Sequence, residues 1–100
     1  MLRRTEGDVM YLTLEEDLVA SNVKTFKAEI HDYVGGVEID EIVLNMSRCE
    51  NIDSVGVTFV VSLYKLITEE AKSFRVTGSS DEIKQLFKLM KLDEFFDLDD

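Results

Sequence analysis

The sequence contains no proline, one cysteine and one histidine among its 100 residues. Cys49 alone cannot form an internal disulfide, so the chain suits a reducing compartment, and we expect a small buried apolar group there. Cys49 and His31 cannot supply the ligands of a zinc site, and the sequence predicts no other metal and no cofactor. It shows neither a nucleophile beside a histidine-acid pair nor a glycine-rich phosphate loop, so we assign no catalytic residue and do not expect an enzyme.

Basic residues are scarce as well. Eleven lysines and arginines stand against 21 acids, which gives a net charge of −10. Nucleic-acid phosphates and anionic membrane surfaces would repel such a chain, so neither is an expected partner. No apolar run approaches the ~20 residues of a membrane-spanning helix. The basic pair Arg3–Arg4 is followed by acids rather than by the apolar core of a signal peptide, so we expect a cytoplasmic protein without membrane insertion.

The length and the 45% of hydrophobic residues predict one domain over 1–100 with a modest core. The predicted elements, in chain order, are strands at 2–5 and 9–14, a helix at 21–34, a strand at 41–46, a helix at 54–72, a strand at 74–77, and a helix that starts at the capping sequence 79–82. This ββαβαβα order is typical of an α/β fold with a mostly parallel mixed sheet flanked by helices. Strand 41–46 is apolar in its middle, so we expect it to be central and covered on both faces.

Local signals predict how several elements begin and end. Ser21 or Asn22 can cap the first helix, because a short polar side chain accepts hydrogen bonds from the free amides of the first turn. The glycines at 35–36 can end that helix, since glycine adopts the left-handed conformation readily. In the acidic segment 93–100, both phenylalanines at 95–96 are expected to cap the core and the last acids to fray.

The segment 51–57 is the candidate functional site. It follows the predicted central strand and starts the second helix, the place where ligands and partners usually dock on open α/β sheets. Asp53 or Ser54 can cap the helix, and Gly56 lets another backbone approach closely. A helix cap alone is the simplest explanation of Asp53 and Ser54.

The second helix is apolar over most of its circumference. One stripe comprises Val57, Val60, Val61, Tyr64, Ile67 and Ala71, and a second comprises Phe59, Leu63 and Leu66. Two explanations are open. Either the second stripe packs beneath the other helices, or part of the helix is an exposed contact patch centred on Val55, Thr58 and Phe59.

Several segments together resemble STAS domains, the fold of bacterial anti-sigma factor antagonists. They are 41–46 (EIVLNM), 52–56 (IDSVG), 64–65, 74–77 and 83–96. The resemblance covers nearly the whole chain, and its most specific part is Asp53-Ser54-x-Gly56. It implies a STAS fold and a partner-switching cycle. In that cycle the antagonist binds an anti-sigma factor, a serine-kinase-like ATPase, and phosphorylation of a serine at the start of the second helix blocks binding.

The sequence departs from the family pattern in two places. The family's phosphoacceptor directly precedes the glycine, and that position is Val55, which has no hydroxyl group. Ser54 keeps a hydroxyl one residue earlier, at a position that the family does not usually phosphorylate. The family's Gly-x-Leu-Asp segment reads Glu-Asp-Leu-Val at 16–19, without its glycine and its aspartate.

These observations predict a partner-binding regulator that lacks the usual phosphorylation switch. The predicted partner-binding residues are Asp53, Ser54, Val55, Gly56, Thr58 and Phe59. The alternative is a constitutive STAS docking subunit of a transport complex or a stressosome-like assembly. The missing phosphoacceptor would suit such a subunit, because constitutive docking needs no switch. A homodimer is left open by the sequence.

Overall fold

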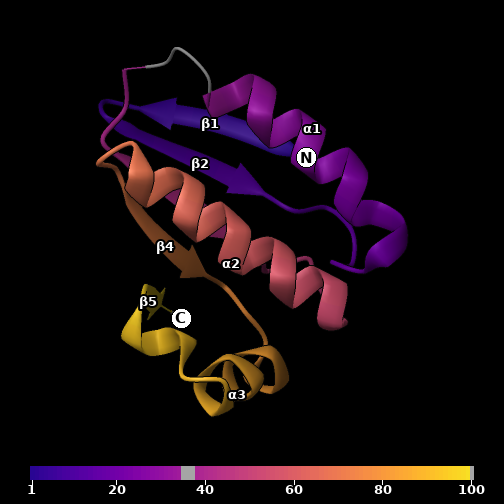
Figure 1. The fold of residues 1–100 in the computed structure, drawn as a ribbon. Coiled ribbons are helices and arrows are strands. Elements are labelled where there is room, and N and C mark those ends of the chain that lie inside the picture. Colours follow the sequence, from indigo (N-terminus) through magenta and orange to yellow (C-terminus); the bar gives the residue numbers. More distant parts are fainter. Residues whose placement is uncertain (35–37, 100) are drawn as a thin grey trace.

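Five strands and three α-helices make up this domain in a computed structural model, which describes residues 1–34 and 38–99. In chain order the elements are β1 (Leu2–Glu6), β2 (Val9–Thr13), α1 (Ala20–Val34), β3 (Glu41–Asn45), α2 (Ser54–Glu69), β4 (Ser73–Thr77), α3 (Asp81–Leu89), the 3-10 helix η1 (Leu92–Glu94) and β5 (Asp97–Asp99) (Figure 1). The predicted ββαβαβα order is therefore confirmed, with one further strand at its end.

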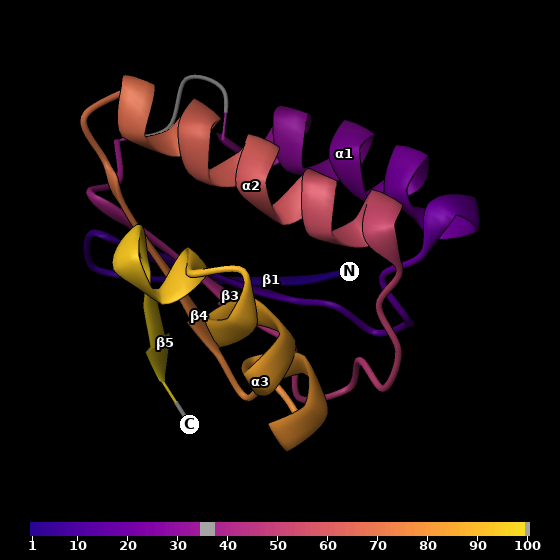
Figure 2. The same ribbon diagram turned by 60° about the horizontal axis from the view of Figure 1, so that its bottom comes forward.

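The strands form one mixed sheet in the order β1-β2-β3-β4-β5. β1 runs antiparallel to β2, and the other three pairs are parallel. Each parallel crossover steps to the next strand in the same direction, and right-handed crossovers of this kind place their helices on the same face. Figure 2 shows α1 and α2 side by side over that face.

One row of side chains shows where the core lies. Met10, Ile42 and Phe74 are paired in register on β2, β3 and β4, and all three are buried against the helices. Phe96 closes the core at the β4 side, because its ring centroid lies 5.2 Å from that of Phe74 and 6.2 Å from that of Phe87 on α3. Aromatic rings at these separations add specific edge contacts to the area they bury.

The expectation that β3 is central and buried on both faces is confirmed, although α1 and α2 lie over only one of these faces. Val43 faces away from the buried cluster that contains Ile42 and Leu44. It is nevertheless 1% exposed, and in register it lies between Tyr11 of β2 and Arg75 of β4. The middle of the strand is therefore apolar on both faces, whereas its ends, Glu41 and Asn45, are polar and half-buried.

The first helix starts one residue earlier than predicted and is not capped by Ser21 or Asn22. Both residues lie inside α1, and the Asn22 side-chain amide donates instead to the carbonyl of Asp17 at 2.9 Å. The cap prediction is wrong because the acceptor for the first turn comes from a distant part of the chain. The predicted stop at 35–36 lies outside the described residues.

The second helix ends at Glu69, three residues before the predicted end. Lys72 N donates to Ile67 O, and Ala71 N donates to Thr68 O. These two bonds form a Schellman motif, in which the residue after the cap takes the left-handed conformation, and Ala71 has φ +61°. Glycine is the usual residue at this position, so the sequence carries no stop signal there.

The acidic end of the chain forms a strand rather than fraying. Residues 97–99 pair in parallel with β4, while Asp100 lies outside the described residues. Of the two phenylalanines expected to cap the core, Phe96 is buried, whereas Phe95 is 58% exposed. Phe96 is buried in the core directly before this strand, and Leu98 pairs in register with Val76 of β4. These two contacts hold the strand in place.

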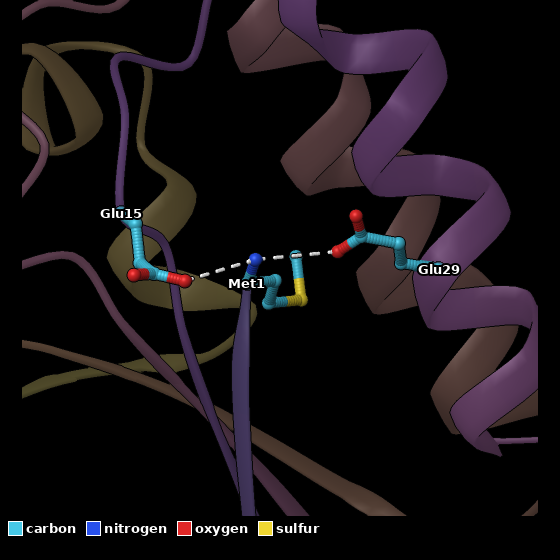
Figure 3. A network of polar contacts seen from close by, with 3 residues as sticks. All are labelled: Met1, Glu15 and Glu29. Atoms are coloured by element: carbon cyan, nitrogen blue, oxygen red, sulfur yellow. Dashed lines mark ion pairs between the residues drawn. The ribbon is translucent and has the colours of Figure 1, made fainter.

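The amino group of Met1 lies between two carboxylates. It is 3.2 Å from Glu15 and 3.4 Å from Glu29 of α1, so it ties the start of β1 to the helical layer (Figure 3). Burial lowers the pKa of this amine, but hydrogen bonds and charge from the two glutamates outweigh it and the net pKa is raised. Across residues 1–34 and 38–99, no helix has the length and apolarity needed to cross a bilayer.

Candidate functional site

Two loops at the carboxyl ends of β2 and β3 run side by side and bring the starts of α1 and α2 together. Leu18 and Ile52 form a parallel bridge beyond the sheet. Leu18 N donates to Asn51 O at 3.0 Å, and Asp53 N donates to Leu18 O at 3.3 Å. These backbone bonds hold the Asp53 segment beside Leu18.

Asp17 fastens the same two loops through its side chain. One carboxylate oxygen accepts from the amides of Glu50 and Asn51 at 3.0 and 3.1 Å, and the other accepts from the Asn51 side chain at 3.0 Å. These bonds, the Asn51 side-chain amide first, lower the pKa of Asp17. Sequence reasoning missed this residue, although it belongs to the segment 16–19 that departs from the family pattern.

Asp53 caps two helices at once. Its Oδ1 accepts from Gly56 N at 2.8 Å, which makes it the N-cap of α2, and its Oδ2 accepts from Ala20 N at 2.9 Å, the first residue of α1. Hydrogen bonds from Ala20 and then Gly56 lower the pKa of Asp53, so the carboxylate stays ionised. The predicted cap is confirmed for α2, and the second bond gives Asp53 a further role in positioning α1.

Gly56 sits where the two loops meet α2. A Cβ atom at this position would lie 2.0 Å from the carbonyl oxygen of Leu18 and 2.9 Å from Cγ1 of Ile52. Only a residue without a side chain fits there, so the expected close approach of another backbone is real. That backbone belongs to the same chain, in the loop with Leu18 that joins β2 to α1. Gly56 is buried and has no side chain that could contact a partner.

The exposed residues at the start of α2 are Ser54, Val55 and Thr58. Val55 is 45% exposed, one of few large apolar side chains at the surface. The Thr58 hydroxyl donates to the carbonyl of Ser54 at 2.9 Å, which leaves its methyl group as the part available for contact. Asp53 is half-buried and fully engaged in capping. We call the surface formed by Ser54, Val55 and Thr58 the α2 start surface.

Phe59 does not belong to this surface, so its place in the predicted contact patch is wrong. It is 6% exposed, and Leu63 of the same stripe is 3% exposed. Both pack in the core beside Ile30 of α1, and only Leu66, 39% exposed, reaches the surface at the rim of a shallow groove. The second apolar stripe is therefore explained mainly by α1, which covers it.

Two further side chains considered from the sequence are Cys49 and His31. Cys49 is 3% exposed, as expected of a small buried apolar group, and its thiol donates to Asn51 O at 3.3 Å. Burial raises the pKa of this thiol. His31 is exposed on α1. Within the described ranges, no three His, Cys, Asp or Glu side chains are grouped as metal ligands.

Comparison with known proteins gives the family. The family model of the STAS domain matches residues 1–100. The chain therefore belongs to the STAS family, and it has the fold of anti-sigma factor antagonists.

Three solved structures illustrate the likeness. A proposed anti-sigma factor antagonist of Thermotoga maritima has a TM-score of 0.89 and 24% identity, over 99% of this chain and 85% of the other. The Bacillus cell fate determinant SpoIIAA in its phosphorylated form has a TM-score of 0.76 and 18% identity, over 99% and 89%. A chain from the stressosome, described as a signal integration and transduction hub, has a TM-score of 0.77 and 19% identity, over 98% and 86%. At these identities the likeness shows the fold.

Proposed function

We propose that this STAS domain is a cytoplasmic regulator that binds an anti-sigma factor, a serine-kinase-like ATPase, through the α2 start surface and without the usual phosphorylation switch. The observation that carries the proposal is the side chain of Val55. It is 45% exposed at the position where the family resemblance places the acceptor serine. An exposed valine offers a partner apolar contact but no oxygen to phosphorylate.

Ser54 is a poor substitute acceptor for electrostatic reasons. The carboxylate of Asp53 precedes it, and hydrogen bonds to Ala20 and Gly56 lower the pKa of that carboxyl group. A phosphate on Ser54 would therefore stand beside a fixed negative charge. The Gly56 amide, which could otherwise bind an anion at the helix start, already donates to Asp53 at 2.8 Å.

The substitution Val55→Asp tests the binding surface. It places a charge in the centre of the proposed apolar contact, so affinity for the anti-sigma factor kinase of the source organism should fall about tenfold or more. Isothermal titration with the purified kinase measures this. The matched control is Leu89→Asp on α3, which adds the same charge at a site that is 81% exposed. Equal affinity of V55D and wild type would remove the α2 start surface from the proposal.

A constitutive docking subunit is the second candidate, because the chain also shares its fold with a component of the stressosome. A regulator should elute with the kinase as a discrete complex of a few chains, since partner switching exchanges single partners. A docking subunit should instead be recovered in a large particle. Size-exclusion chromatography with light scattering on the native complex separates these outcomes.

A further inference from the structure

The outer edge of β1 is open. All five of its residues are exposed, and all five pair in unbroken register with β2 on the other side. Among the described strands, β1 is the end of the sheet, and Figure 1 shows it there beside α1. An open edge of this length presents unpaired N–H and C=O groups to other chains.

The hairpin geometry identifies the free backbone groups. A two-residue turn at 7–8 makes its flanking residues, Glu6 and Val9, a hydrogen-bonded pair. Bonding alternates along an antiparallel ladder, so Leu2, Arg4 and Glu6 direct their backbone groups toward β2. Arg3 and Thr5 direct theirs outward.

The charged side chains of β1 lie over the faces of the sheet and leave its edge clear. The Arg3 guanidinium is 4.7 Å from the ring centroid of Tyr33 on the helical face. On the opposite face, Arg4 lies 4.5 Å from the ring centroid of Tyr11 and 3.2 Å from the Glu6 carboxylate. Natural edges are usually blocked by proline, bulges or charges that project across them, and β1 has neither proline nor bulge.

We propose that β1 pairs antiparallel with β1 of a second copy of this chain, about a two-fold axis at Thr5. The free groups of Thr5 then meet their symmetry mates, and Arg4 of each copy lies opposite Glu6 of the other. Opposite charges at directly opposed positions stabilise a strand pair. An axis at Arg3 or Arg4 would instead set that arginine against itself, so charge selects the Thr5 register.

The dimer would present two partner-binding surfaces. Figure 1 shows the start of α2 at the opposite end of the sheet from the turn between β1 and β2, so we expect the α2 start surface to stay outside the contact. An isologous contact of this kind closes on itself. The pairing of β1 with the acidic edge strand β5 of another copy would be heterologous and would give open chains instead.

Sedimentation equilibrium on the full chain tests the proposal, from about 1 µM to about 1 mM at about 0.15 M salt, which covers weak and strong dimers. Wild type should fit a monomer–dimer equilibrium. Arg4→Glu and Glu6→Arg should each weaken the dimer about tenfold or more, because each sets like charges opposite one another twice. The double variant R4E/E6R should recover dimerisation. Thr5→Pro, which removes an outward N–H, should abolish it.

Arg4→Glu makes the net charge more negative, whereas Glu6→Arg makes it less negative. General charge repulsion would therefore weaken only the first dimer, whereas loss of the Arg4–Glu6 pair between copies should weaken both. Lys88→Glu, an exposed change on α3, is the control and should leave the dimer constant unchanged. Thermal unfolding monitored by circular dichroism confirms that each variant is folded. A wild-type monomer at every concentration, open-ended oligomers, or a stronger dimer in E6R would overturn the proposal.

Discussion

The carboxylate of Asp53 accepts a hydrogen bond at 2.9 Å from the backbone amide of Ala20, 33 residues earlier in the chain. The same carboxylate caps α2 through Gly56 at 2.8 Å. One side chain therefore links the starts of α1 and α2. The α2 start surface lies next to this link. Its geometry is a property of the fold and does not require a partner.

Replacement of Asp53 should destabilise the domain more than the loss of an ordinary cap. Asp53→Ala removes the acceptors of two helix starts, whereas Ser80→Ala removes only the acceptor of Ile83 N at the start of α3. The Ser80 variant should cost about 1 kcal/mol. Urea unfolding of both variants measures the difference, and an Asp53→Ala loss no larger than that of Ser80→Ala would contradict the two-helix role.

A methyl group at position 56 should be poorly tolerated. Gly56→Ala places Cβ 2.0 Å from the Leu18 carbonyl oxygen, which the backbone bridge to Ile52 holds in place. We expect a loss of about 3 kcal/mol or more in the free energy of unfolding. Gly7→Ala is the matched control, since it has open space and only a positive φ of 57°, which costs about 1–2 kcal/mol. Equal losses for the two variants would argue against the tight contact.

Acid should loosen the joined loops. The pKa of Asp17 is lowered by hydrogen bonds from the Asn51 side chain and from the amides of Glu50 and Asn51. Its stabilising contribution is present above its unfolded pKa of 3.8 and is lost as the pH falls through the lower folded value. Thermal midpoints measured from pH 5 to about pH 2 should therefore fall less steeply in Asp17→Asn than in wild type. An equal slope in Asp17→Asn and wild type would contradict this role of Asp17.

The sequence was sufficient for those features that depend on local patterns. Alternation and apolar runs located the strands at 9–14 and 41–46, and the serines at 79–80 marked the start of α3. The order of these elements then predicted a parallel sheet. Short-range chemistry of this kind is readable because each signal and its effect lie within a few residues.

Long-range contacts explain what the sequence did not reveal. The cap of α1 comes from Asp53, and the clamp on residues 50–51 comes from Asp17, so neither has a local signal. The strand at 97–99 is too short and acidic to recognise, because its pairing depends on Phe96 reaching the core. The left-handed turn at Ala71 lacks the glycine that usually marks it. Tertiary contacts decided the first three of these features, whereas the turn at Ala71 is formed by local hydrogen bonds at the end of α2.

The phosphorylation state of the α2 start tests the central claim most directly. Wild type, Val55→Ser and Ser54→Ala are incubated with the partner kinase and ATP, and intact-mass spectrometry counts the phosphates. We predict no phosphate on wild type or on Ser54→Ala, and one phosphate on Val55→Ser together with weakened kinase binding. Stoichiometric phosphate on wild type that disappears in Ser54→Ala would contradict the account.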